Sequence, residues 1–186
     1  MRGTLPASGP LYPRRSAPLP LKKGGGKSAD RLKNAEETAL GLLARRDYSR
    51  EEMRLTLTAK GFPPMEIGDT LRKLEAKKIL DDSRYARHLA ISLAQEKILG
   101  PQRLRQKFFQ KGIPADLAHD AMAIADATFP VKERLRHIME KKLKGRRLDE
   151  LTLNEKKKLA DALHRKGFVW EDVQATMDES GGFADE

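Results

Sequence analysis

The sequence predicts an all-α protein of three tandem three-helix repeats, expected to form an elongated, curved molecule with a disordered basic N-terminal arm. From Asp30 onward, apolar residues recur at helical spacing, and no stretch alternates apolar and polar residues for long enough to indicate a strand. A basic residue, a glycine and an apolar residue occur in that order three times, at Gly61, Gly112 and Gly167. Charged residues make up 34% and aromatic residues 5% of the chain, which disfavours a thick β-sandwich or a deep pocket.

Residues 1–29 form the predicted arm, which is rich in Pro, Gly and Ser and shows no periodicity. Such a segment cannot bury enough apolar surface to offset its chain entropy. Residues 1–34 hold eight Lys or Arg and one Asp, which gives +7 of the total net charge of +10. An arm of this charge suits a polyanion such as nucleic acid, an acidic protein surface or an anionic membrane, although a tail kept soluble by its charge has the same composition.

The three glycines align the repeats and predict one buried stripe in each. Counted from the glycine, apolar residues stand at −8, −4, +1, +6 and +10 in all three units. The members of the stripe are Met53, Leu57, Phe62, Ile67 and Leu71, then Leu104, Phe108, Ile113, Ala118 and Met122, then Leu159, Leu163, Phe168, Val173 and Met177. A stripe that continues across a glycine predicts a helix, a tight left-handed turn and a second helix.

Local signals mark where these helices begin. Ser49 with Glu52, and Thr152 with Glu155, match the capping box, and Pro101 after Gly100 fits a first helical position. After the glycines at 61 and 112, prolines restart the chain as the next helix. A further helix precedes each pair: residues 30–46 before the first, the stretch from Asp81 before the second and the stretch from Phe129 before the third.

These signals divide the chain into five parts. The expected parts are the arm at 1–29, modules at 30–80, 81–128 and 129–180, and a tail at 181–186. Each module is too small to be stable alone, so we expect its neighbours to support it.

The stretch "LDDSRYARHL" from Leu80 to Leu89 concentrates polar chemistry and raises the question of an active or metal site. Adjacent aspartates diverge on a helix, and a hard cation would need further oxygen ligands that the stretch does not supply. A helix cap explains the pair more simply, because Asp81 or Asp82 could accept hydrogen bonds from the first free amides of the helix that follows. Tyr85 and Leu89 then belong to the buried face of the helix that follows.

No catalytic constellation is visible elsewhere. The four histidines are far apart, and "KKGGGKS" lacks the strand and first glycine of a phosphate-binding loop. We therefore predict no enzyme activity, no catalytic residue, no metal site and no cofactor.

Basic residues recur in successive modules and are the candidate functional residues. Charges on a helix usually form only its solvated face, but if the modules curve, these faces could line one surface for a phosphate backbone or an acidic protein groove. The candidates are Arg87, Lys97, Arg103, Arg105, Lys107, Lys111, Lys141, Lys142, Arg146 and Arg147. Arg134 belongs to the same run of basic residues in the third module. Aromatic residues do not interleave with these charges, and Phe108 is expected in the core.

Two stretches, "LDDSRYARHLA" and "LGPQRLRQKFFQKGI", resemble the RecX family of bacterial recombination regulators. The shared features are an Asp-Asp start, an aromatic residue followed by Ala-Arg, a glycine before a basic helix, and Lys-Gly-Ile. They correspond here to Asp81, Asp82, Tyr85, Ala86, Arg87, Gly100, Lys111, Gly112 and Ile113. The resemblance covers roughly residues 30–179 and is strongest from Leu80 to Ala125; Trp170 departs from it, and the arm lies outside it.

The resemblance implies a crescent-like helical protein that binds the RecA recombinase, lies along the groove of the RecA–DNA filament and regulates it, most simply by blocking extension or promoting disassembly. It also implies some affinity for DNA and no catalysis. A helical module that binds single- or double-stranded DNA directly is the alternative, because a helix, a glycine turn and a helix also describe a helix-turn-helix.

The composition indicates the cellular compartment of the protein and its relation to membranes. The absence of cysteine excludes disulfides and thiolate sites and fits a reducing compartment. No stretch approaches the roughly 18 apolar residues that span a bilayer, and no signal-peptide core precedes the body. We expect a soluble, cytoplasmic monomer without a membrane partner.

Overall fold

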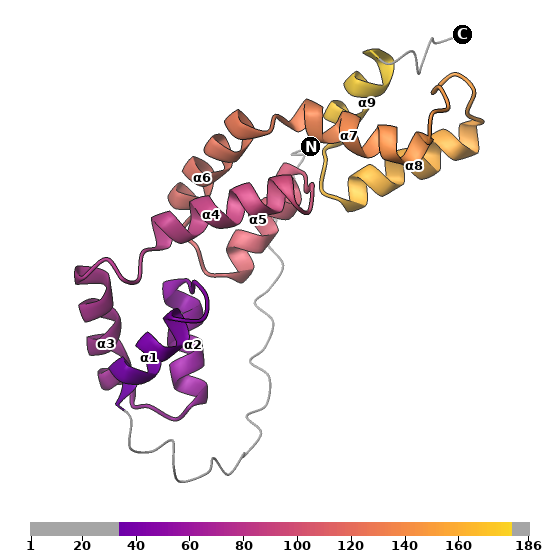
Figure 1. Ribbon diagram of the computed structural model, residues 1–186. Coiled ribbons are helices and arrows are strands. Elements are labelled where there is room, and N and C mark those ends of the chain that lie inside the picture. The colour runs from indigo at the N-terminus through magenta and orange to yellow at the C-terminus, as the bar shows by residue number, and fades with distance from the viewer. Residues whose placement is uncertain (1–33, 180–186) are drawn as a thin grey trace, which may run out of the picture. The chain divides into compact units, whose positions relative to one another are not determined.

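The computed structural model describes residues 34–179, and all regular structure within this range is helical. The predictions for residues 1–29 and 181–186 lie outside the described residues. The helices are α1 (Ala35–Leu43), α2 (Arg50–Ala59), α3 (Pro64–Ala76), α4 (Asp82–Gln95), α5 (Pro101–Gln110), α6 (Ala115–Thr128), α7 (Val131–Leu143), α8 (Leu153–Arg165) and α9 (Trp170–Glu179) (Figure 1). The predicted all-α fold of repeated three-helix units is confirmed.

The helices pack in three groups of three, each around its own core. α1, α2 and α3 contact one another, as do α4, α5 and α6, and α7, α8 and α9 (Figure 1). We call these groups the first, second and third module. Each encloses a separate cluster of buried apolar side chains. The predicted stripe forms these cores: of its fifteen members only Phe62 is partly exposed.

The glycine turns take the predicted left-handed geometry. Gly61, Gly112 and Gly167 have φ of 89°, 67° and 90°. At each turn the amide of the next apolar residue donates back into the preceding helix, as when Phe62 N donates to Leu57 O over 3.3 Å. A positive φ is nearly free only for glycine, so the turn that reverses each helix pair depends on this residue.

Several helix starts are as predicted, and two differ. Thr152 and Glu155 form the full capping box, whereas Ser49 caps α2 but Glu52 turns its carboxylate away from this cap. The opening helix was predicted over 30–46 and occupies Ala35–Leu43 within the described residues. It begins there because the Asn34 side chain accepts a hydrogen bond from Glu37 N at 2.8 Å.

Candidate interaction surface

The aspartate pair that opens α4 has a structural role. Asp81 is the N-cap and accepts a hydrogen bond from Arg84 N at 3.0 Å. Asp82 accepts from Arg50 N at 2.7 Å, and burial raises the pKa of its carboxyl group. Among residues 34–179, no group of three His, Cys, Asp or Glu side chains could hold a metal ion. The pair thus begins a helix and joins it to α2 of the first module.

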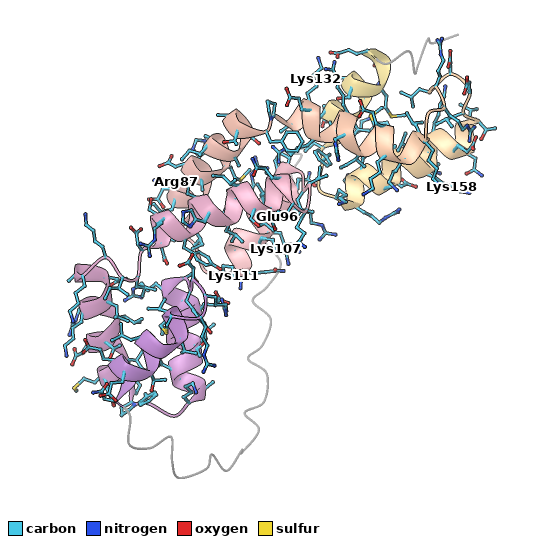
Figure 2. The ribbon with its side chains drawn as sticks, in the orientation of Figure 1. Arg87, Glu96, Lys107, Lys111, Lys132 and Lys158 are labelled. Atoms are coloured by element: carbon cyan, nitrogen blue, oxygen red, sulfur yellow. The ribbon has the colours of Figure 1, made fainter. Side chains whose placement is uncertain are left out.

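Six of the ten candidate basic residues are exposed and form no ion pair with another described residue. They are Arg87, Lys97, Arg105, Lys107, Lys141 and Lys142. Lys107 makes only a long contact of 3.3 Å with the amide oxygen of Gln110. Figure 2 labels Arg87 on α4 and Lys107 on α5. These side chains keep their full charge available to a partner.

The other four candidates are engaged within the protein. Lys111 donates to Glu52 at 2.6 Å, and Arg103 Nε donates to the carbonyl oxygen of Arg165 at 3.0 Å. Arg146 and Arg147 contact acidic side chains near the start of α8, Glu155 at 2.8 Å and Asp149 at 2.8 Å. Lys111 and Arg103 therefore join modules, which their positions in the sequence do not reveal.

Glu52 is the centre of the joint between the first and second modules. Its carboxylate accepts hydrogen bonds from Arg46 at 3.1 Å, Lys111 at 2.6 Å and the Tyr85 hydroxyl at 3.2 Å. Burial, reinforced by the charge of Glu52, raises the pKa of Tyr85 to about 12. Ser49 adds a hydrogen bond of 2.6 Å from its hydroxyl to Lys111 O.

A second joint connects the second and third modules through the backbone. Gly100 N donates to Lys166 O at 2.9 Å, and Gln102 N donates to Gly167 O at 3.0 Å. In the opposite direction, Lys166 Nζ donates a hydrogen bond of 2.8 Å to Lys97 O. A Cβ at Gly100 would lie 2.4 Å from the backbone of Gly167, so this approach needs glycine.

The placement of Arg134 on a basic surface was wrong. Its side chain is fully buried, where it donates to Leu99 O at 2.7 Å and to Asp126. Burial lowers the pKa of Arg134, and Asp126 opposes this effect. The sequence holds a signal for this position: Arg134 stands three residues after Val131 and four before Ile138, on the apolar face of α7.

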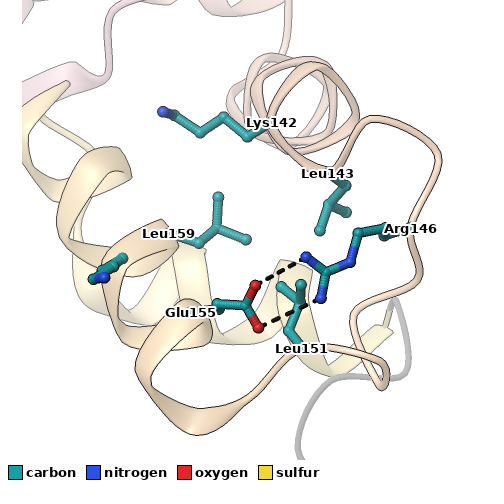
Figure 3. A pocket seen from close by; sticks show the side chains of 7 residues that line it. Lys142, Leu143, Arg146, Leu151, Glu155 and Leu159 are labelled. Carbon is teal, nitrogen blue, oxygen red and sulfur yellow. Dashed lines mark hydrogen bonds and ion pairs between the residues drawn. The ribbon is translucent and has the colours of Figure 1, made fainter.

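A small hollow opens between the end of α7 and the start of α8 (Figure 3). Its volume is about 240 Å³, and it is lined by Lys142, Leu143, Arg146, Leu151, Glu155, Lys158 and Leu159. Hydrogen bonds from Arg146 and Thr152 lower the pKa of Glu155 to about 2, so its carboxylate is charged at neutral pH. Of these residues, the sequence predicts Lys142 and Arg146 as binding candidates, whereas the leucines and Lys158 join the site only through the fold.

No helix between residues 34 and 179 has the length and apolar character needed to cross a bilayer.

Comparison with known proteins gives a consistent result. The models of the RecX first and second three-helix domains match residues 35–74 and 81–122. The Regulatory protein RecX of Chlorobaculum tepidum is 34% identical over 144 residues, which cover 77% of this chain and 86% of the relative. The Regulatory protein RecX of Prosthecochloris aestuarii is 32% identical over 149 residues, which cover 79% of this chain and 93% of the relative.

Solved structures agree in fold. The crystal structure of RecX from Lactobacillus salivarius superimposes with a TM-score of 0.70 at 22% identity, covering 82% of this chain and 98% of that one. A second crystal structure of regulatory protein RecX gives a TM-score of 0.68 at 22% identity, and the match covers 77% of this chain and 71% of that one.

Proposed function

This chain belongs to the RecX family of regulatory proteins, and from that premise we propose that it regulates homologous recombination and DNA repair without catalysis, by binding the RecA recombinase. In this proposal it acts as a monomer in the cytoplasm, binds the RecA–DNA filament, and limits filament extension, ATP hydrolysis and strand exchange.

The observation that carries the proposal is the set of exposed, unpaired basic side chains on the second and third modules of a chain from a regulatory family. Arg105 and Lys107 on α5 and Lys141 and Lys142 on α7 face solvent without a carboxylate partner among the described residues. An unpaired cation on a surface attracts an acidic or phosphate-bearing partner over about 8 Å at physiological salt.

The two joints give a reason why few molecules could affect a long filament. Hydrogen bonds through Glu52 and through Gly100 connect each module directly to the next. A partner bound by one module is therefore held beside the next module as well, which raises the local concentration for a second contact. One chain would then engage neighbouring protomers and resist their rearrangement.

The proposal is tested by RecA-catalysed ATP hydrolysis on single-stranded DNA with sub-stoichiometric amounts of this protein. We expect hydrolysis to fall and filaments to shorten in electron micrographs. Unchanged hydrolysis together with unchanged filament length would overturn the proposal.

Charge reversal then locates the surface. Arg105→Glu with Lys107→Glu should weaken inhibition roughly tenfold, because two attractive contacts become repulsive. Arg45→Glu with Lys78→Glu is the matched control, since both residues are exposed in the first module and the change in net charge is the same. Equal loss in both variants would indicate a general charge effect and not a specific surface.

Direct DNA binding is the second candidate, favoured by the guanidinium groups of Arg87 and Arg105, which are free to contact phosphates. It predicts binding to DNA without RecA, with log affinity falling steeply against log salt. If the Arg105 and Lys107 reversals abolish DNA binding and leave RecA inhibition intact, this surface faces DNA. Arg103 and Arg147 are unsuitable for this test because they hold contacts within the protein.

A further inference from the structure

The hollow between α7 and α8 combines an apolar floor with a basic rim. Leu143, Leu151 and Leu159 form the floor, and Figure 3 shows these three side chains grouped between the two helices. Leu143 and Leu151 are only partly buried, so the floor is accessible from outside. An accessible apolar floor gains free energy when another apolar side chain covers it.

The rim carries two free cations. Lys142 and Lys158 are exposed and form no ion pair with any described residue. Three basic side chains and one acidic side chain line the hollow, which leaves a net charge of +2.

Glu155, the one acidic residue of the lining, is already hydrogen-bonded within the protein. Both carboxylate oxygens of Glu155 accept from Arg146, and one of them also accepts from the backbone and hydroxyl of Thr152. Figure 3 marks the two contacts with Arg146. Glu155 is therefore held at the cap of α8, and Lys142 and Lys158 remain uncompensated.

Size and chemistry narrow the class of ligand. Small-molecule sites usually measure about 300–1,000 Å³, whereas this hollow measures about 240 Å³, which suits one anchoring side chain better than a cofactor. The lining contains no aromatic residue on which a nucleobase could stack. A phosphate backbone would also leave the leucine floor uncovered.

We propose that the hollow binds an acidic peptide segment of a partner protein, which inserts one apolar side chain between Leu143, Leu151 and Leu159 and places flanking carboxylates near Lys142 and Lys158. A buried apolar anchor with charged contacts at its edge is a common arrangement in peptide recognition. Lys142 also belongs to the basic side chains of the proposed RecA contact, but peptide binding is measured without RecA, so each of the two proposals can fail without the other.

The test uses the full chain and a fluorescein-labelled synthetic peptide with acidic residues on both sides of a central leucine. Fluorescence anisotropy should show saturable binding that weakens as salt is raised. Lys142→Glu and Lys158→Glu should each weaken binding roughly tenfold. Replacing the central leucine of the peptide by serine should weaken binding roughly tenfold as well, since serine buries much less apolar surface against the three leucines.

Lys157→Glu is the matched control, because Lys157 is exposed on the same helix, is adjacent to Lys158 and does not line the hollow. This variant should keep the wild-type affinity within about twofold, as expected for a charge outside the contact. Unchanged thermal unfolding by circular dichroism confirms that each variant is folded.

Three results would overturn the proposal. Equal weakening by Lys157→Glu and Lys158→Glu would show only general attraction between opposite charges. Equal binding of the leucine and serine peptides would show that the floor is not used. Tighter binding of a single-stranded DNA oligonucleotide that depends on the same two lysines would assign the surface to nucleic acid.

Discussion

Gly100→Ala should separate the third module from the second. Gly100 has φ −78° and ψ 167°, which alanine adopts without strain, so any loss of stability must come from the new methyl group. That group would lie 2.4 Å from the carbonyl carbon and oxygen of Gly167 and 2.5 Å from the amide nitrogen of Phe168. Backbone atoms cannot swing aside as a flexible side chain can.

The expected cost follows from the contacts at this joint. Overpacking costs about 2 kcal/mol. The two backbone hydrogen bonds of the joint, from Gly100 N at 2.9 Å and Gln102 N at 3.0 Å, contribute about 1 kcal/mol each and would be stretched. The free energy of unfolding should therefore fall by about 4 kcal/mol, which shifts the urea midpoint by about 2 M at a slope of about 2 kcal/mol per M.

The assay is urea denaturation followed by tryptophan fluorescence and circular dichroism. Trp170 is the only tryptophan and lies at the start of α9, so its fluorescence reports on the third module. Gly68→Ala is the control, because Gly68 lies inside α3 with nothing within 4 Å of an added Cβ. This substitution should stabilise the protein by about 0.5–1 kcal/mol. A wild-type midpoint for Gly100→Ala would refute the close approach of the two glycines.

Three further predictions concern buried and charged groups. Asp126→Asn should cost about 3 kcal/mol because it leaves the buried charge of Arg134 without a carboxylate. Arg134→Met should cost less because the partly exposed Asp126 can be hydrated, and equal losses of unfolding free energy in urea denaturation would contradict this. Glu155 has a pKa of about 2 in the folded protein against a usual 4.5. Its contribution to folding stability is therefore complete above about pH 4.5 and is lost as the pH falls toward 2. The melting temperatures of the wild type and Glu155→Gln should converge in this window, and a constant difference between them would exclude a stabilising role of the Glu155 charge. Glu52→Gln should lower the pKa of Tyr85 below about 12, as measured by ultraviolet titration. It should also lower the free energy of unfolding by about 1.5–3 kcal/mol, because hydrogen bonds to a charged group are lost. An unchanged titration of Tyr85 would show that Glu52 does not contact it at the joint.

The helical class and the core could be predicted because they depend on neighbours in the sequence. Successive members of the apolar stripe, the residues of each glycine turn and the Thr152 cap with Glu155 each lie within about one or two helical turns of one another. Helical periodicity and the φ preference of glycine act over that range. The opening helix lies within its predicted range but is shorter than predicted, and its start depends on one side chain, Asn34.

Which basic residues are free was decided by tertiary structure. Lys111 and Glu52 are separated by 59 residues and Arg103 and Arg165 by 62, so no periodicity reveals that they meet. Free and engaged cations look alike in a sequence, because charge is a property of the residue and pairing is a property of its surroundings.

The sequence by itself therefore determined the repeat, the helices and the residues that could bind an anion. Only the packing of one module against the next selected among those residues: it engaged Lys111 and Arg103 at the joints and left Arg105, Lys107 and Lys142 free. The packing of α7 likewise buried Arg134. The physical reason is that a charged side chain gains a partner only where folding brings a distant carboxylate or carbonyl within hydrogen-bond distance.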